Sequence, residues 1–299
     1  MAGRLKKLLP KKLRTKLGSD DVVIPVVKLS GAIAAGGSAF RPALNLGSCA
    51  LRLEKAFSTK GAPAVAIVVN SPGGSPVQSR LIYRRIRDLA EEHQKKVHVF
   101  VEDAAASGGY MIACAGDDIT ADPSSIVGSI GVISASFGFV DAIEKIGVKR
   151  RVYTAGQNKS VLDPFLPEKK VDIDRLKALQ LEIHQVFIDL VKEARGDRLA
   201  EHKDMFTGQF WTGGPAKEMG LIDEIGDLRS RLKALYGEKT KLNLIEPKRG
   251  LFGNKVAAGV STAALSSGMT LDSEALAAGM ADGFLTAAEE KLLWNRLGL

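Results

Sequence analysis

The stretch Asp103-Ala-Ala-Ala-Ser-Gly-Gly-Tyr-Met-Ile-Ala-Cys-Ala115 joins two apolar runs through a turn that contains Ser107. The preceding run, residues 97–101, is typical of a short buried strand, and the following run, residues 110–115, is typical of a helix packed closely on a sheet. The glycines after Ser107 allow another backbone or a substrate to come close. Free N–H groups at the start of such a helix can stabilise an oxyanion, so the pattern suits a nucleophile as well as a helix N-cap.

Strands, glycine-rich loops and helices alternate on both sides of this stretch. Residues 22–29 are expected to form an edge strand, because Pro25 has no N–H to donate to a central ladder. Residues 63–69 form a continuous apolar run, which is typical of a buried parallel strand. The other predicted strands are 118–121 and 149–154, the predicted helices are 44–57, 78–92, 136–146 and 168–195, and 123–131 is a predicted loop. This alternation predicts an α/β fold with a largely parallel sheet and flanking helices.

Length, charge and cysteine content narrow the class of protein. The chain has 299 residues, a net charge of +8 and 45% hydrophobic residues, which suits one large domain or two small ones. Cys49 and Cys114 are expected to be buried free thiols, and no His/Cys cluster has metal-ligand spacing. No apolar run approaches the roughly 18 residues of a membrane span, and the start of the chain lacks the apolar stretch of a secretory signal. We therefore expect a cytoplasmic location.

Three parts are expected along the chain. The first is a basic segment at 1–21, in which Pro10 interrupts a helical spacing of leucines. The proline favours a disordered tail, with peripheral contact to the inner face of a membrane through anionic lipid as the alternative. Residues 22–240 form the main domain. Residues 241–299 form an Ala/Gly/Ser-rich tail with a final amphipathic helix near 285–297.

A serine nucleophile needs a base to take its proton. The four histidines, at positions 93, 98, 184 and 202, lie on or beside predicted strands and helices, and nothing favours any of them. Lys159 lies in a loop and is the other candidate, although most lysines are solvated surface residues. A lysine that acts as a base must be neutral, and lowering a lysine pKa from about 10.4 to near 7 costs roughly 4 kcal/mol.

Six short motifs follow one another along the chain in a specific order. They are NSPGG at 70–74, ASGGY at 106–110, GSIGV at 128–132, GQNK at 156–159, FTG at 206–208 and LIDEIG at 221–226. Each motif is weak alone, but in this order they resemble the signal peptide peptidase A family, also called protease IV, over residues 22–233.

The resemblance implies the crotonase/Clp-protease-like fold and a serine peptidase with a Ser/Lys dyad. By the family's pattern, Ser107 would be the nucleophile and Lys159 the general base. Ser129 would orient the lysine, and the backbones of Gly74 and Gly108 would form the oxyanion hole. No metal or nucleotide cofactor is implied.

The resemblance also implies a homo-oligomer in which the serine and the lysine of one site come from neighbouring subunits. Monomers would then be inactive. The implied substrates are short hydrophobic or unfolded peptides, among them remnants of signal peptides. Many family members have an N-terminal membrane anchor, whereas this chain begins with the basic segment. The apolar C-terminal tail could reach back into the protein's own groove and be trimmed there.

Two other classes of function stay open. A crotonase-type acyl-CoA enzyme has the same fold and would not need Lys159, and binding of CoA thioesters would reveal it. A non-catalytic oligomeric scaffold at the membrane surface would tolerate loss of Ser107 and would bind anionic vesicles in a salt-sensitive way. Nucleic-acid binding is not favoured, since the basic residues form no patch interleaved with aromatic residues.

Overall fold

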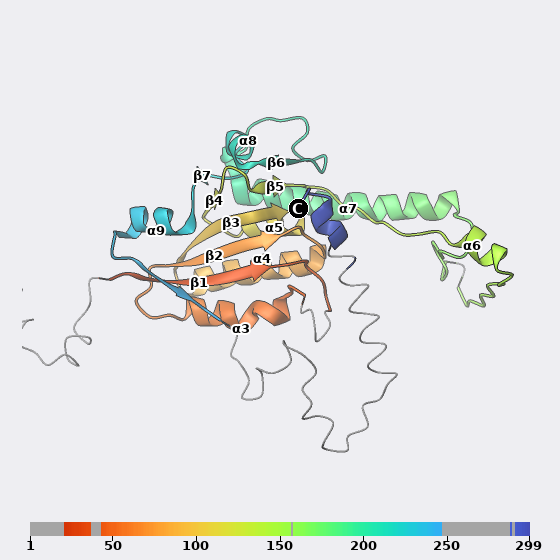
Figure 1. The fold of residues 1–299 in the computed structure, drawn as a ribbon, viewed down its shortest axis with the longest axis horizontal. Helices are drawn as coiled ribbons and strands as arrows, with labels where there is room; N and C mark the ends of the chain where they lie inside the picture. Colours follow the sequence, from red (N-terminus) through yellow and green to blue (C-terminus); the bar gives the residue numbers. More distant parts are fainter. Residues whose placement is uncertain (1–20, 37–42, 157, 247–287, 289–290) are drawn as a thin grey trace, which may run out of the picture.

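The computed structural model describes residues 21–36, 43–156, 158–246, 288 and 291–299 (Figure 1). One sheet forms its centre, with strands in the order β6-β5-β3-β2-β1-β8, and with β4 pairing to β3 and β7. Every strand pair is parallel except β5 with β6. The strands are β1 Val23–Ser30, β2 Ala64–Ser71, β3 Lys96–Ala106, β4 Asp118–Ala121, β5 Ile126–Gly128, β6 Phe210–Thr212, β7 Glu224–Ile225 and β8 Lys241–Leu244. The predicted α/β class with a largely parallel sheet is confirmed.

Strand β2 lies inside the sheet and is buried on both faces. Ile67 and Val69 belong to the larger hydrophobic cluster, whereas Ala66 and Val68 belong to a smaller cluster on the opposite face. Because successive side chains of a strand point to opposite faces, burial on both sides requires apolar residues at successive positions. The apolar run predicted to be a buried parallel strand therefore is one.

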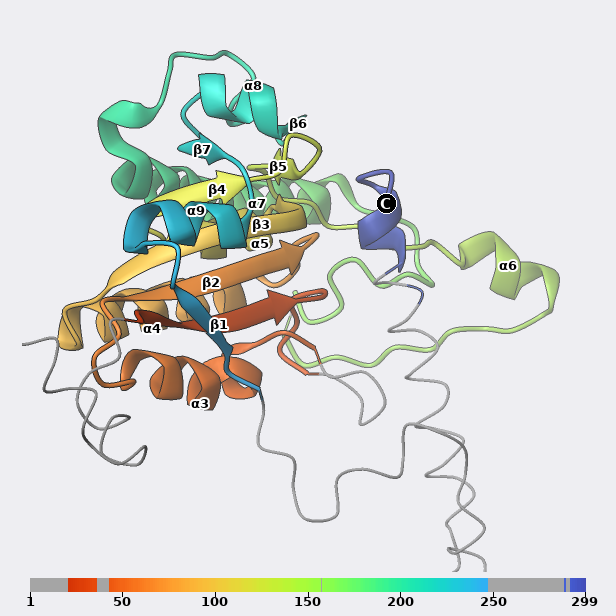
Figure 2. The same cartoon turned by 60° about the vertical axis from the view of Figure 1, so that its left-hand side comes forward.

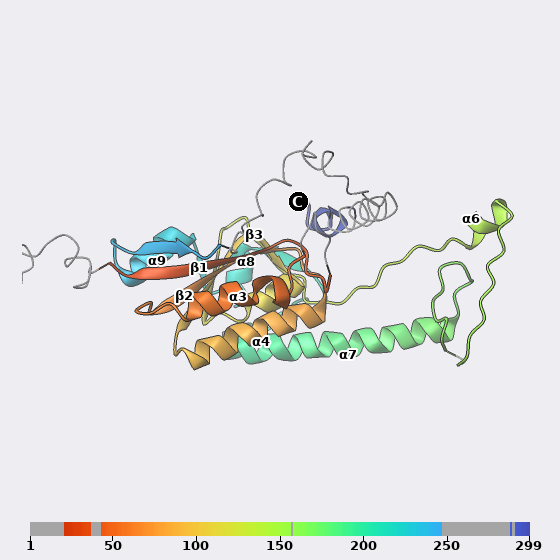
Figure 3. The same ribbon diagram turned by 90° about the horizontal axis from the view of Figure 1, so that it is seen from below.

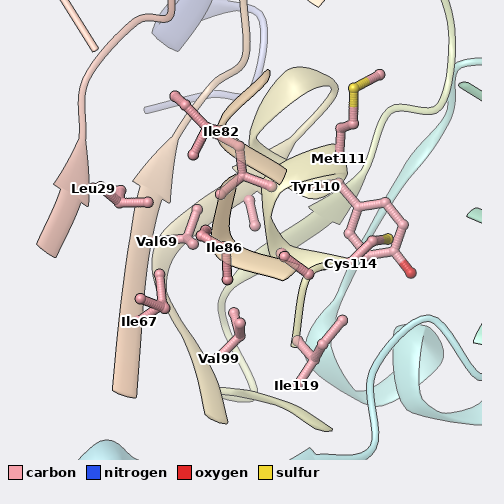
Figure 4. Packing of buried hydrophobic residues seen from close by; sticks show 14 of the residues in the cluster. Leu29, Ile67, Val69, Ile82, Ile86, Val99, Tyr110, Met111, Cys114 and Ile119 are labelled. Carbon is pink, nitrogen blue, oxygen red and sulfur yellow. The ribbon is translucent and has the colours of Figure 1, made fainter. Parts of the chain in front are cut away.

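Helices cover the two faces of the sheet unequally (Figures 2 and 3). The larger cluster packs the sheet against α3, α4 and α5, where Ile82 and Ile86 of α4 lie near Val69 and Val99 (Figure 4). Leu232 of α9 packs on the other face. Complete burial of one such aliphatic side chain stabilises a fold by about 1.5–3 kcal/mol. The helices are α3 Leu46–Phe57, α4 Pro76–Glu92, α5 Gly108–Ala113, α6 Val140–Lys145, α7 Lys170–Arg195, α8 Gly213–Glu218 and α9 Leu228–Tyr236, with a short 3-10 turn at Gly196–Arg198.

The prediction that the first strand is an edge strand is wrong. Strand β1 lies between β2 and β8, and β8 comes from residues just past position 240. Pro25 lies opposite Asn243 of β8, whereas the register with β2 begins only at Val26. The proline, which lacks an N–H, thus precedes the first residue of β1 that pairs with β2. An interior strand can accommodate a proline at such a position.

Two further predictions of local structure are wrong. Residues 149–154 are not a strand: the side chain of Tyr153 is 91% exposed, and no neighbouring strand in the described part of the chain pairs with this segment. Residues 123–131 are not simply a loop, because β5 lies within them and pairs with β3 and β6. The sheet continues through β3 as far as Ala106, directly before Ser107.

Residues 132–156 and 158–182, here called the arm, project beyond the sheet. Figures 1 and 3 show α6 at its far end and the first part of α7 returning from it toward the sheet. Helix α6 is shorter than the predicted helix at 136–146 and has no buried residue. Among the helices of the described residues, α7 included, none has both the length and the apolar character needed to cross a membrane. Apart from Asp21, the predicted basic segment at 1–21 lies outside the described residues.

Candidate active site

Ser107 occupies the turn between β3 and α5 and has a strained backbone. Its φ of 52° and ψ of −120° are unusual for a residue with a side chain, and such conformations cost of the order of 1–3 kcal/mol. Its N–H donates to the carbonyl oxygen of Gly128 at 2.8 Å, and its carbonyl accepts from the N–H of Met111 at 3.0 Å. The Ser107 hydroxyl makes no capping hydrogen bond, so a role as helix N-cap does not account for this serine.

The turn after β2 approaches Ser107 so closely that it requires glycine. A Cβ atom on Gly73 would lie 2.8 Å from Cβ of Ser107. A Cβ atom on Gly74, which has a φ of +137°, would lie 2.0 Å from the carbonyl oxygen of Ile33. That carbonyl accepts from the N–H of Ser75 at 2.7 Å, and the N–H of Ile33 donates to the Gly73 carbonyl at 2.8 Å. These bonds fix the Gly74 backbone beside the serine.

Two backbone N–H groups beside Ser107 are free to bind an anion. Within the described part of the chain, the N–H groups of Gly74 and Gly108 have no hydrogen-bond acceptor. Gly108 is the first residue of α5, where N–H groups have no partner inside the helix and carry partial positive charge. Both glycines line the same pocket as Ser107. The structure therefore brings together the predicted nucleophile and the two predicted oxyanion-hole positions.

Ser129 lines this pocket as well and lies in the turn after β5. It has a φ of 53° and is 7% exposed, and its N–H donates to the carbonyl oxygen of Gln209 at 2.7 Å. Nearby, a Cβ atom on Gly131 would lie 2.9 Å from Cα of Gly208. The GSIGV and FTG motifs are thus packed against each other, and this contact holds the Ser129 turn at the pocket.

The pocket around these residues encloses about 330 Å³ and has a mainly apolar wall. Most of the wall was not predicted from the sequence, because its residues come from segments far apart in the chain. Only Ile183 and Phe187 have a sequence signal, since they lie four residues apart on the apolar face of α7. The apolar side chains of the wall are Pro72, Pro76, Met111, Val132, Ile133, Ile183, Phe187, Phe210, Leu293 and Leu297.

Lys159 lies elsewhere in this chain. It is exposed, it does not line the pocket, and it is part of the loop of the arm between α6 and α7 (Figure 3). The loop is hydrogen-bonded within itself and to α7. The N–H of Lys159 donates to the Gly156 carbonyl at 3.3 Å, and Arg175 of α7 donates to the side chain of Asn158 at 2.5 Å. One chain therefore does not bring Ser107 and Lys159 together.

Among the described residues, the pocket of a single chain is lined by no side chain that can act as a base. Among the described residues that line it, Arg296 is the one ionisable group, and a guanidinium stays protonated. His98 is buried elsewhere and bonds to Asp118 and Tyr236, at 2.7 Å each. His184 is nearer, but its Nε2 lies 3.0 Å from the carbonyl oxygen of Ile130 and the residue does not line the pocket.

The LIDEIG motif connects α5, α7 and β4 through hydrogen bonds. Arg195, at the end of α7, is 2% exposed and donates two hydrogen bonds to Asp223, at 2.8 and 2.9 Å. Asp223 also accepts from the N–H of Ile119 in β4 at 2.7 Å, and the hydroxyl of Tyr110 in α5 donates to the Leu221 carbonyl at 2.7 Å. Burial alone would raise the pKa of Asp223, but hydrogen bonding to Arg195 and its charge outweigh burial and lower that pKa. This motif is structural.

Comparisons with known proteins place the sequence among known families. The model of Peptidase family S49 matches residues 90–241. The chloroplastic serine protease SPPA of Arabidopsis thaliana is 32% identical over 240 residues, which are 76% of this chain and 33% of that protein. Protease 4 of Haemophilus influenzae is 35% identical over 179 residues, which are 58% of this chain and 28% of that protein.

A protein of Brucella abortus named Na(+)/H(+) antiporter NhaA is 61% identical over all 299 residues of this chain, which match 39% of its own length. The chain thus spans less than half the length of each of these three relatives. The antiporter name refers to the whole of that longer protein, of which this chain matches only part, so the name says nothing about the function of the matched part. The family model spans about half of the chain, in line with the order of the glycine motifs. This chain therefore belongs to Peptidase family S49, which confirms the resemblance.

Proposed function

We propose that this chain is a serine endopeptidase in which Ser107 is the nucleophile and Lys159 of a neighbouring copy is the general base. One observation carries the proposal. The Ser107 hydroxyl makes no capping bond and lies in a pocket where, among the described residues, two backbone N–H groups are unpaired and no side chain can act as a base. The loop with Lys159 lies on the arm, beyond the sheet that carries Ser107 of the same chain (Figure 1).

The reaction then follows from the roles of these groups. The Ser107 Oγ attacks the carbonyl carbon of the peptide, and the neutral amine of Lys159 takes the hydroxyl proton. The N–H groups of Gly74 and Gly108 bind the oxyanion, and loss of one such donor typically lowers the rate by about 10²–10³. The protonated lysine gives its proton to the leaving amine, and water then hydrolyses the acyl-enzyme with the lysine again as base. Ser129 orients the lysine amine.

The arm supports assembly with a second copy of the chain. Large apolar side chains are exposed at many positions along it, and exposed apolar surface that gathers into large patches marks protein contacts. In the proposed assembly, these side chains pack against the neighbouring copy and place Lys159 at its Ser107 pocket. The most exposed of them are Ile133, Phe137, Ile146, Val148, Tyr153, Val171, Leu179 and Leu181.

The proposed substrates are short apolar or unfolded peptides, including remnants of signal peptides. The wall of the pocket, with Met111, Phe187 and Phe210, suits an aliphatic side chain next to the scissile bond. The proposed location is the cytoplasmic side of a membrane, where the basic residues of the segment 1–21 would contact anionic lipid.

Mixing two inactive variants tests the shared site. Ser107→Ala and Lys159→Ala are each expected to lack activity toward an unstructured protein and toward short apolar peptides. After subunit exchange, random pairing should restore about one quarter of wild-type activity, because one site in four receives both groups intact. As the control, Ser107→Ala is mixed with the double variant Ser107→Ala/Lys159→Ala, which cannot restore a site. Mixed oligomers seen by native mass spectrometry without any recovered activity would refute shared sites.

A further inference from the structure

The last residues of the chain form a helix with a sequence-encoded stop. Residues 291–295 are helical, and the N–H of Gly298 donates to the Asn295 carbonyl at 3.1 Å while the N–H of Leu299 donates to the Trp294 carbonyl at 3.2 Å. With Gly298 at a φ of 77°, these two bonds form a Schellman motif, the usual glycine-dependent end of a helix. The described part of the predicted helix at 285–297 is therefore an ordered element with its own termination signal.

This C-terminal helix lies on the Ser107 pocket. Leu293, Arg296 and Leu297 line that pocket together with Ser107 and Ser129. Spacings of three and four residues place these three side chains on one helix face. The adjacent Leu292 is 56% exposed. Figure 2 shows the C-terminal helix beside the end of the sheet, near the point where the arm leaves it.

We propose that the chain's own C-terminal helix is a ligand of the Ser107 pocket and closes it to peptides. The contact is apolar, since Ile183 and Phe187 of α7 line the same pocket as Leu293 and Leu297 of the helix. The effect on activity rests on the proposed peptidase function, whereas the closure of the pocket does not. A substrate peptide must displace the helix before it can reach Ser107.

The helical backbone argues for a blocker and against a substrate, because the carbonyls of Leu292, Trp294 and Asn295 already accept hydrogen bonds within the segment. The N–H of Arg296 donates to the Leu292 carbonyl at 3.2 Å, and the N–H of Leu297 donates to the Trp294 carbonyl at 2.9 Å. A scissile carbonyl has to accept from the oxyanion-hole donors at Gly74 and Gly108 instead. The segment would need to unwind before it could be cleaved, which argues against the trimming expected from the sequence.

The closure is reversible, since little besides the pocket holds the helix. A helix this short is marginal in water by itself, because nucleation is unfavourable and few bonds follow. None of its residues belongs to the hydrophobic core clusters of the described chain. Its removal should therefore leave the fold of the main domain intact.

Thiol labelling in the full-length Ser107→Cys protein measures access to the pocket without any need for catalysis. The native thiols give little background, since Cys49 and Cys114 are both buried. Burial raises the pKa of the Cys49 thiol to about 11 and that of the Cys114 thiol to about 12. In the closed state we expect slow modification by a maleimide. Leu293→Asp, or deletion of residues 291–299, should raise the rate by about tenfold or more, because a charge or an absent helix leaves the apolar wall uncovered.

Leu292→Asp is the matched control, because it places the same charge one residue away on an exposed side chain. It should leave the labelling rate unchanged, and a synthetic peptide of residues 285–299 should slow labelling of the deletion protein again. Equal labelling rates in the Ser107→Cys protein with and without the helix would overturn the proposal. If wild type and all variants lack peptidase activity while labelling still depends on Leu293, the proposed function fails and the closure stands.

Discussion

The N–H of Ser107 donates to the carbonyl oxygen of Gly128 at 2.8 Å, so the turn that bears the proposed nucleophile is tied directly to the turn that bears Ser129. The two serines follow neighbouring strands, because Ala106 of β3 is paired with Gly128 of β5. Both have a left-handed backbone, with φ of 52° and 53°. The geometry of the site thus depends on a strand pair, and a change in β5 should reach Ser107.

Gly128→Ala is expected to lower both stability and activity. Gly128 has a φ of +107°, and a Cβ atom there would lie 2.9 Å from Cε3 of Trp211. The strained backbone and the clash should cost about 1–3 kcal/mol and shift the Ser107 turn. Urea denaturation and kcat measured on the same protein check this. Gly214→Ala is the control: it lies in α8 with no atom within 4 Å of the new methyl group, and should change neither quantity adversely. A Gly128→Ala protein as stable as wild type would contradict the argument.

Lys159→Arg is expected to abolish most activity although it preserves the charge. A guanidinium cannot be neutral near physiological pH, so it cannot take the Ser107 proton, and loss of a general base lowers rates by about 10²–10⁴. The measurement is kcat on a short apolar peptide, with light scattering to show unchanged assembly. Lys177→Arg, at another exposed lysine of the arm, should behave as wild type. If Lys159→Arg retained full activity, the base would have to be another group.

Asp223→Asn should destabilise the fold at neutral pH by about 3–5 kcal/mol, because it leaves the buried Arg195 charge without its partner. The pKa of Asp223 is lowered in the folded protein. The ionised carboxylate therefore adds stability above the ordinary aspartate pKa of about 3.9, and this contribution disappears as pH falls through the folded-state value. Denaturation at pH 7 and pH 3 should show a gap between wild type and variant that narrows in acid.

Asp174→Asn supplies the matched comparison for that experiment. Asp174 is exposed on α7 and pairs with Lys170 at 2.8 Å, one turn earlier. Exposed pairs of this spacing contribute about 0.3–0.5 kcal/mol, so this variant should be nearly as stable as wild type at both pH values. Equal losses in Asp174→Asn and Asp223→Asn would mean that burial of Arg195 does not decide the effect.

The central strands could be predicted from the sequence, because strands that are buried on both faces consist mainly of apolar residues. β2 is apolar at successive positions since both of its faces are covered, and that pattern is local. The place of β1 depended on β8, which lies far along the chain and has mostly exposed residues. No local pattern indicates such a partner. Residues 149–154 have strand-forming residue types, but lie on the arm without a neighbouring strand.

The site divides in the same way. The turns with Gly74, Ser107 and Ser129 were predicted as parts of one site through the resemblance to a family whose glycine-rich motifs occur in a recognisable order, and all three residues line one pocket. The wall of the pocket was not predicted: Phe210 and Leu293 are ordinary apolar residues, and only the fold brings them together. The motifs therefore identify the proposed chemistry, whereas the residues that limit access to it depend on tertiary structure.

The arm has a consequence for when such an enzyme would act. Lys159 lies beyond the sheet and away from the serine of its own chain. In the proposed mechanism, an active site therefore forms only when two chains associate. Specific activity should then rise with protein concentration and fall on dilution. A newly made chain, still alone, would be harmless to other proteins until enough copies had accumulated.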